Sequence, residues 1–399
     1  MAAANPEIMK WAREKSGLSL EEAAHALGIH SAWGTTGGDR LAALETGDGE
    51  PSQQLLQKMS QRYHRSLLVF YLDAPPKQGD RGQDFRLAPG AQPPAYNATL
   101  DALLRDIKAR QGVVRTLLDD EDTARNPFVG SASTAMDPTG LGDSIATSLL
   151  FHLGDFRNQT SISAAFSYLR SRIEGVGIFV ILAGNLGSHH SNISSDIFRG
   201  FAISDPIAPF IVLNDQDARS AWPFTALHET VHIWLGTTGV SGAAADTQIE
   251  RFCNDVAGEI LLPTEELQEI ATISARSLEE SAKTIAEFAI VRNISRAMVT
   301  YKLFRSGIIV AGRWRELTAR FQQEWLQSKS QNNNKDGGSQ GGPSYYTIRR
   351  HRLGPSLLGL VNRSLQDGLI SPTRAGQVLG VKARSVGPLL NDIGAQAGA

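Results

Sequence analysis

The chain has almost no cysteine, no long hydrophobic run and no excess of charge of either sign. Its single cysteine, Cys253, excludes an internal disulfide and a zinc site built on several thiolates, and it favours a reducing compartment. No stretch approaches the roughly 18 unbroken apolar residues that a membrane-spanning helix needs, and residues 1–10 lack the apolar core of a signal peptide. We therefore expect a soluble, cytoplasmic protein without a membrane partner.

Charge is balanced over the whole chain but not along it. The formal net charge is −2, so there is no overall attraction to nucleic acid or to an anionic membrane surface. Residues 1–75 carry seven cations and nine anions, whereas residues 344–399 carry seven cations and two anions. The cations of that last segment are Arg349, Arg350, Arg352, Arg363, Arg374, Lys382 and Arg384. If DNA is contacted, we expect this segment to contact it; the alternative is that it docks on the rest of the chain or on a partner.

Residues 1–75 are predicted to form a helical bundle like a helix-turn-helix module. Apolar positions recur at helical spacing in two short segments between residues 6 and 27, and Ser19 with Glu22 forms a capping box that opens the second. Two further helices are predicted over residues 40–44 and from residue 53 onward. An apparent insertion at residues 31–38 falls where a DNA-recognition helix should begin. Binding of a protein is therefore as good an interpretation of this module as binding of DNA.

The middle of the chain is predicted to combine a connector with a mixed domain. Residues 76–138 begin with a Pro- and Gly-rich stretch and continue into a polar amphipathic helix over residues 100–118. Residues 139–275 alternate helical segments with strand-like runs, which lie at 177–182, 199–204 and 210–214. A small sheet backed by helices is the architecture that this order predicts.

The remainder is predicted to be helical. Residues 276–326 form an extension in which 278–304 resemble a helix, a turn and a second helix. Residues 327–343 are predicted to be a flexible linker, because nothing in them can be buried to offset the entropy of ordering. Residues 344–399 follow as a separate basic helical module. The fold class is therefore α+β and mostly helical.

The segment with the clearest chemistry is a His-Glu-x-x-His motif at residues 228–232, set in a helical pattern of apolar residues. Histidines four residues apart lie one turn apart on a helix, so His228 and His232 can bind one Zn²⁺ ion. Glu229 is then placed to take a proton from a zinc-bound water and return it to the leaving amine. This set of residues predicts peptide hydrolysis; a chance pairing of two core histidines is the alternative.

A third protein ligand is predicted on the following helix, residues 246–262. That helix offers Glu250, Asp255 and Glu259. We choose Glu250, because Asn254 follows it by one turn and can hold a liganding histidine while the carboxylate binds zinc. Glu259 lies 2.5 turns further on, so it faces away from Glu250 and is the reserve candidate.

Two other groups near this motif are interpreted as having no part in the chemistry. Cys253 is predicted to be a small core residue rather than a nucleophile, and a role as a zinc ligand stays open but is not needed. His189 and His190 lie in a Ser-rich loop, where adjacent histidines are usually solvated, and an oxyanion-stabilising role for them is the weaker alternative.

With these residues in place, the chain resembles the ImmA/IrrE family of bacterial metallo-endopeptidases, in the long form that begins with an XRE-type helix-turn-helix. The matching segments of the peptidase region are 210–214, 222–232 and 249–263, and those of the N-terminal region are 11–14, 18–24, 45–51, 63–65 and 84–86. Two departures are Val231, where the family usually has glycine, and Leu44, where it has tryptophan. The pairing of Glu250 with Asn254 is similar to that in thermolysin-like enzymes.

The resemblance implies a gluzincin-like fold and a role in regulation. Members of the family cleave a specific partner protein, often a DNA-binding repressor of the phage or stress type, and so control transcription. Two other hypotheses stay open: a helix-turn-helix transcriptional regulator whose zinc site is structural or sensory, and an antitoxin-like interaction protein whose site is vestigial. Dispensability of Glu229 would favour the first, and absence of stoichiometric zinc would favour the second.

Overall fold

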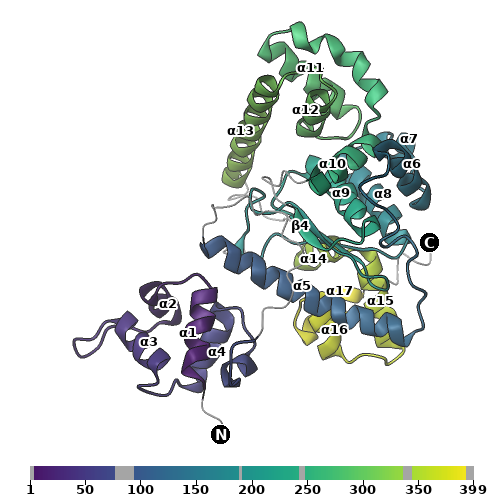
Figure 1. Ribbon diagram of the computed structural model, residues 1–399. Helices are drawn as coiled ribbons and strands as arrows, with labels where there is room; N and C mark the ends of the chain where they lie inside the picture. Colours follow the sequence, from purple (N-terminus) through teal and green to yellow (C-terminus); the bar gives the residue numbers. More distant parts are fainter. Residues whose placement is uncertain (1–3, 77–93, 188–190, 242–247, 336–343, 392–399) are drawn as a thin grey trace. The chain divides into compact units, whose positions relative to one another are not determined.

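The computed structural model describes residues 4–76, 94–187, 191–241, 248–335 and 344–391 (Figure 1). The chain divides into two compact units. Unit 1 comprises Met1–Arg81, Pro89–Ile107 and Asn185–Ile193, and unit 2 comprises Gly82–Ala88, Lys108–Gly184 and Ser194–Ala399. The long helix α5, Pro94–Asp120, contributes its first half to unit 1 and its second half to unit 2, and it contains the predicted helix at 100–118.

Unit 1 contains the helical bundle predicted for residues 1–75. Its helices are α1 (Pro6–Lys15), α2 (Leu20–Leu27), α3 (Gly37–Thr46), α4 (Gln53–Arg62) and the 3-10 helix η1 (Leu67–Tyr71). The capping box of Ser19 and Glu22 at the start of α2 is confirmed. Ile8, Leu41, Met59 and Phe70 are among the fully buried side chains of its core. Arg13 and Glu45 form a buried bidentate ion pair, at 2.8 and 2.9 Å, that ties α1 to α3.

The insertion between α2 and α3 ends in a tight hairpin. Ala32 and Thr35 exchange two backbone hydrogen bonds of 3.0–3.1 Å across it, and Trp33 stands fully exposed at its tip with φ of 57°. The single cation of α3 is Arg40, whose exposed guanidinium donates one hydrogen bond to the carbonyl of His30 at 2.7 Å. The helix that would read DNA therefore carries one basic side chain, which is few for contacts to phosphates.

Unit 2 is built around a four-stranded mixed sheet in the order β1-β3-β2-β4. β1 (Phe179–Leu182) and β3 (Phe210–Leu213) are parallel, and β2 (Gly200–Ile203) is antiparallel to both β3 and β4 (Gly239–Ser241). β1, β2 and β3 are wholly buried and confirm the three predicted strands to within two residues at each end. β4 was not predicted, because three residues beginning with glycine carry too short a pattern to reveal a strand.

Helices of unit 2 pack on this sheet and on one another. They are α6 (Pro138–Ser148), α7 (Leu153–Arg157), α8 (Ile162–Gly175), α9 (Trp222–Trp234), α10 (Gln248–Leu261), η4 (Thr264–Ala275), α11 (Leu278–Ile290), α12 (Arg296–Arg305) and α13 (Ala311–Lys335), with the short 3-10 helix η3 (Arg219–Ala221) before α9. α8 contacts β1, and α9 lies across β2 and β3. One hydrophobic core runs from Leu141 to Phe321, so it does not stop at residue 275, where the sequence places the end of the peptidase domain.

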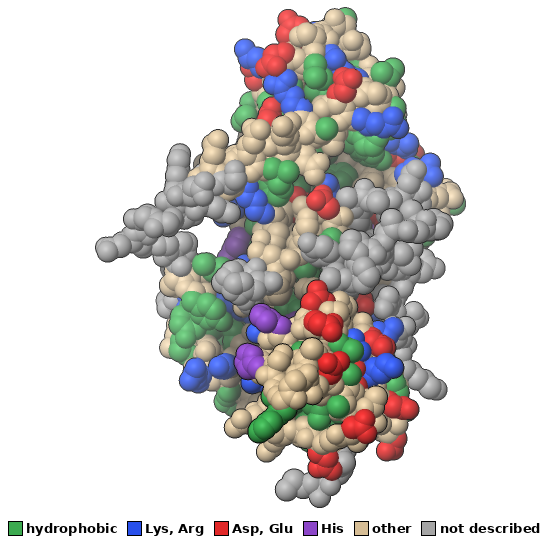
Figure 2. Space-filling model, turned by 90° about the vertical axis from the view of Figure 1, so that its left-hand side faces the viewer, with side chains coloured by type: hydrophobic (Ala, Val, Ile, Leu, Met, Phe, Trp, Pro, Cys, Tyr) green, Lys and Arg blue, Asp and Glu red, His purple; other side chains and the backbone are tan. Residues whose placement is uncertain are grey.

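The helical extension carries charges of both signs. Figure 2 shows acidic and basic side chains interspersed over the upper part of the molecule, where α11–α13 lie. Several are paired, as Arg320 is with Glu279 and Arg296 with Glu324. α13 continues to Lys335, so the structure places the first nine residues of the predicted linker in a helix. Once a helix is nucleated, adding polar residues costs little. The rest of that linker, 336–343, lies outside the described residues.

The C-terminal segment packs on the rest of unit 2. Its helices are α14 (Tyr345–Leu353), α15 (Pro355–Gln366), α16 (Pro372–Leu379), η6 (Ala383–Ser385) and α17 (Val386–Leu390), and α14 packs against β1. The buried guanidinium of Arg170 on α8 donates to Glu174 at 2.9 Å, to the carbonyl of Val180, and to the carbonyl of His351 at 2.5 Å. Glu174 in turn accepts from the amide of Ser356 at 3.1 Å. The described part of the C-terminal segment thus contacts the rest of unit 2, as in the docking alternative that the sequence left open.

Candidate metal centre

α9 carries the His-Glu-x-x-His motif into the core. Pro223 in its first turn starts the helix, where a missing amide proton costs nothing, and Leu227, Val231 and Trp234 bury its apolar side. His228 and His232 lie one turn apart on it, with 3.2 Å between their Nε2 atoms and 4.9 Å between their ring centroids. Both imidazoles therefore turn the same nitrogen toward one point.

α10 brings Glu250 to that point. Its Oε2 lies 3.1 Å from Nε2 of His228, and its Oε1 lies 3.2 Å from Nε2 of His232. Ligand atoms of a tetrahedral site with bonds of about 2.0–2.1 Å are separated by about 3.3 Å, so these three donors fit a zinc ion. The structure thus brings together the three residues that the sequence predicts as ligands, although they come from two helices.

The charges of this cluster suit a metal ligand set. Burial raises the pKa of Glu250, but hydrogen bonds and charges from the two imidazoles outweigh burial and bring its pKa down to about 2. Burial lowers the pKa of His232, and at His228 the contacts with Glu250, Glu229 and Asn254 overcome burial and raise the pKa. The carboxylate is therefore ionised at neutral pH, which is the form that binds a metal.

Further polar side chains lie beside both histidines. Nδ1 of His232 lies 2.9 Å from the hydroxyl of Thr237, just beyond the end of α9. The side chain of Asn254 contributes to the pKa of both His228 and the Tyr301 hydroxyl of α12, so it lies beside both groups. Such contacts fix the ring that presents a nitrogen to a metal. Thr237 and Tyr301 were not predicted, because nothing in their local sequence marks them.

Glu229 is completely buried between α9 and β2. A Cβ on Gly200 would lie 2.8 Å from its Oε1 and 2.9 Å from Cγ2 of Thr225. Only glycine at the start of β2 leaves room for the carboxylate in this place. Its charge raises the pKa of His228, which places it beside the candidate ligands.

Cys253 is a competing donor at the same place. Its sulfur and one ring nitrogen each of His228 and His232 lie within 4.8 Å of one another. Burial first, and then the charges of Glu250 and Glu229, hold the pKa of the thiol well above its usual range. The Glu250 oxygens are nearer to the imidazoles and are already ionised, so we favour the carboxylate as third ligand.

The other acidic residues of α10 are engaged elsewhere. Asp255 pairs with Arg305 of α12 at 2.6 Å, and Glu259, the reserve candidate, accepts from Thr264 at 2.9 Å and pairs with Lys302. His189 and His190 lie outside the described residues.

Comparison with known proteins supports a metallopeptidase. Residues 176–304, about a third of the chain, match the family model described as IrrE N-terminal-like domain, peptidase M78. The matched segment contains the sheet, the His-Glu-x-x-His helix and Glu250, and it extends beyond residue 275 through most of α12. No curated protein and no solved structure gave a match. None of the described helices is both long enough and apolar enough to cross a membrane.

Proposed function

We propose that this chain is a cytoplasmic zinc-dependent endopeptidase in which His228, His232 and Glu250 bind the metal and Glu229 is the general base and then the general acid. The observation that carries the proposal is the convergence of three donors at 3.1–3.2 Å, within a segment that matches a metallopeptidase family. The gluzincin-like arrangement, a glutamate ligand on the helix after the motif, belongs to the proposal as well.

The residues divide the chemistry between them. A zinc ion held by the three ligands would polarise the scissile carbonyl and lower the pKa of water toward neutrality. Glu229 accepts the proton of the attacking water at a carboxylate oxygen and delivers it to the nitrogen of the leaving amine. Gly200 and Thr225 bound the space in which this carboxylate can move.

We propose a regulatory protein, and specifically a DNA-binding repressor, as the substrate. The helical bundle of unit 1 and the resemblance to ImmA/IrrE proteins support this, as does the low number of cations on α3, whose single basic residue is Arg40; this favours a protein as the partner of unit 1. DNA contact is proposed for the C-terminal helices. There Arg349 and Arg350 donate to carbonyls of Gly380 and Leu389, and Arg352 pairs with Asp215, whereas Arg374, Lys382 and Arg384 are exposed.

One observation favours the alternative of a regulator with a structural or sensory zinc site. His228, Glu229, His232 and Glu250 are between 0 and 5% exposed, so a polypeptide reaches them only after local displacement of the residues that cover them. A zinc ion bound in such a place could hold helices together without catalysis. In that case Glu229 is dispensable for the regulatory activity.

The deciding experiment measures zinc first and cleavage second. Zinc content is determined by elemental analysis on the wild type, His228→Ala and Glu229→Gln, and each is incubated with candidate repressors encoded nearby. We expect about one zinc per chain in the wild type, loss of zinc in His228→Ala, and retained zinc with lost cleavage in Glu229→Gln. A wild type that takes up no zinc in metal-replete medium would overturn the peptidase proposal.

A further inference from the structure

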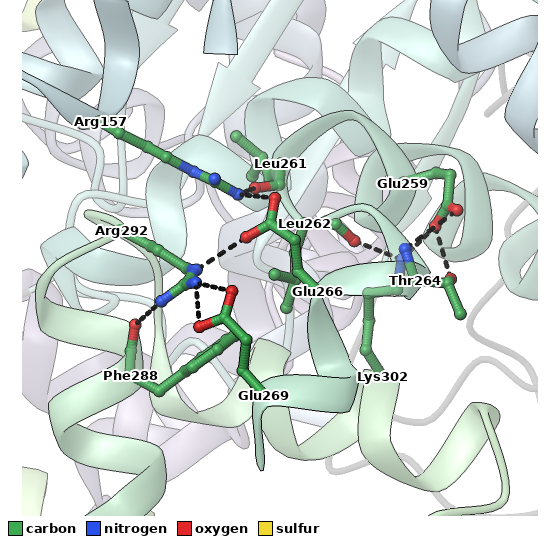
Figure 3. Close-up of polar contacts among 10 residues, drawn as sticks. All are labelled: Arg157, Glu259, Leu261, Leu262, Thr264, Glu266, Glu269, Phe288, Arg292 and Lys302. Atoms are coloured by element: carbon green, nitrogen blue, oxygen red, sulfur yellow. Dashed lines mark hydrogen bonds and ion pairs between the residues drawn. The ribbon is translucent and has the colours of Figure 1, made fainter. Parts of the chain in front are cut away.

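The C-terminal end of α10 is held by a buried lysine from α12. Nζ of Lys302 donates to the carbonyl of Leu262 at 2.5 Å and to the carboxylate of Glu259, which also accepts from the amide and hydroxyl of Thr264 (Figure 3). The side chains of Lys302 and Glu259 are only 7% and 14% exposed. A cation at this position satisfies a carbonyl that the helix leaves unpaired and complements the negative end of the helix dipole.

Two arginines complete the same cluster. Arg157 donates to the carbonyl of Leu261 at 3.2 Å and pairs with Glu266 at 2.9 Å. Arg292, from the turn that follows α11, bridges Glu266 and Glu269 at 2.8–2.9 Å and lies over the ring of Phe288, as Figure 3 shows. The last carbonyls of α10 are thus fixed from two sides. The bonds from α12 are the most deeply buried of these, because Arg157 is 21% exposed.

α12 also contacts α10 at residues closer to the N-terminus of α10. Arg305 pairs with Asp255 at 2.6 Å, and the side chain of Asn254 lies beside both Tyr301 and His228, because it contributes to the pKa of each. The stem of Lys302 passes close to Gly258, where a Cβ would lie 3.3 Å from its Cδ. The side chains of one turn of α12, residues 301–305, therefore contact α10 from Asn254 to Leu262.

These contacts of α12 affect the metal centre because α10 is a rigid helix that also carries Glu250. Glu250 and Glu259 are separated by nine residues, or about 13 Å along the axis. Rotation of the helix by a single residue, about 100°, would turn Glu250 away from both histidines. Metal–ligand distances tolerate deviations of only about 0.2 Å. What fixes the axial position and rotation of α10 therefore fixes the third ligand.

We propose that Lys302 and Tyr301 are positioning residues of the metal centre, so that α12 sets the zinc affinity although it contributes no ligand. The proposal rests on the zinc site of the proposed function. It also explains why the matched family segment continues to residue 304 instead of ending after the last ligand. A purely structural role for α12 makes a different prediction, since it would lower stability with and without metal by the same amount.

The test compares Lys302→Met, which keeps the aliphatic stem, with Arg296→Met in the full chain. Arg296 is the matched control: it lies on the same helix and its partner, at 2.6 Å, is Glu324 of α13 and not a residue of α10. The dissociation constant for zinc is measured by competition with a chromophoric chelator. We expect Lys302→Met to weaken zinc binding about 10- to 100-fold, as loss of an outer contact typically does, and Arg296→Met to change it less than about twofold. Equal zinc affinity in the two variants would overturn the proposal.

Two further measurements keep the outcome decisive. If Lys302→Met does not fold, Tyr301→Phe is measured in its place, because it removes only one hydroxyl group. We expect Tyr301→Phe to bind zinc about fivefold more weakly, which corresponds to the loss of one hydrogen bond. Unchanged zinc affinity of Tyr301→Phe would contradict the proposal. Hydrogen exchange of the metal-free chains reports on α10 directly, and we expect faster exchange around Glu250 in Lys302→Met than in Arg296→Met. Failure of the wild type to bind zinc would contradict the proposed function. Equal hydrogen-exchange rates in Lys302→Met and Arg296→Met would contradict the positioning role alone.

Discussion

Gly200 and Glu229 face each other so closely that residue 200 can carry no side chain. The Cβ of an alanine there would lie 2.8 Å from Oε1 and 3.0 Å from Cγ of Glu229, and 2.9 Å from Thr225, all parts of a buried helix. The position of the proposed general base is therefore set by a glycine on a neighbouring strand as well as by its own helix.

We predict that Gly200→Ala abolishes most of the cleavage activity while leaving zinc bound. The added methyl group displaces the carboxylate of Glu229, and a displacement near 1 Å can cost about 100-fold in rate. The nearest atoms to the added methyl group belong to Glu229 and Thr225 and not to the three ligands, so we expect the ligands to keep their contacts. Zinc content and kcat measured side by side check this; loss of both together would show that the change disrupts the site as a whole.

Separate substitution of Glu250 and Cys253 shows which of the two is the third metal ligand. We expect Glu250→Ala to lose stoichiometric zinc, because it removes an ionised ligand, and Cys253→Ala to retain it with an unchanged affinity. Elemental analysis of the purified variants gives the answer. Zinc lost from Cys253→Ala but kept by Glu250→Ala would make the thiolate the third ligand.

Acid stability of the metal-free chain follows from the pKa of Glu250. This group takes up its proton near pH 4.5 when unfolded but only near pH 2 when folded. Between these values the unfolded state binds more protons, so the free energy of unfolding rises with pH, and the contribution is complete above pH 4.5. Urea titrations from pH 2 to 6 should show a weaker dependence in Glu250→Gln than in the wild type, and parallel curves would contradict the assignment.

Removal of the buried guanidinium at Arg170 is expected to destabilise unit 2 by about 3–5 kcal/mol, because Glu174 would stay buried without its partner. Arg320→Ala provides the comparison, since Arg320 forms ion pairs near the surface, and it should leave the free energy of unfolding nearly unchanged. Chemical denaturation of Arg170→Ala and Arg320→Ala measures the difference. Equal effects would mean that the docking of the C-terminal helices contributes little.

The proposed DNA contact is tested by changing Arg374, Lys382 and Arg384 together to alanine. If each neutralises one phosphate, the logarithmic dependence of affinity on salt should become shallower by about 2.7. Binding to a duplex is measured by fluorescence anisotropy at several salt concentrations. No change in the slope, or no binding by the wild type, would assign these cations to a solvated surface.

Local patterns in the sequence predict the parts of this protein that depend on local geometry. The spacing of His228 and His232 and the pairing of Glu250 with Asn254 are properties of single helices, and the structure brings these residues together. Ser19 and Glu22 form the predicted capping box for the same reason.

Contacts between distant segments could not be predicted in this way. Gly200, Thr237, Tyr301 and Lys302 act at or near the site through packing of separate strands and helices, and no periodicity marks them. The basic C-terminal segment suggested an independent module, but three of its arginines are used within unit 2, on carbonyls and on Asp215. Charge in a sequence shows what a residue can bind and leaves open whether the chain itself already binds it.

The contact between Arg170 and His351 can form only late in synthesis. The carbonyl of His351 lies 181 residues beyond Arg170, and at translation speeds of about 5–20 residues per second the ribosome needs roughly 10–35 s to reach it. Until then the Arg170 guanidinium lacks the carbonyl acceptors that His351 and Arg352 supply. A chain truncated before His351 never acquires them, and a buried donor without an acceptor lowers the free energy of unfolding. The C-terminal helices thus contribute to the stability of unit 2 only after residues 351–356 have been synthesised.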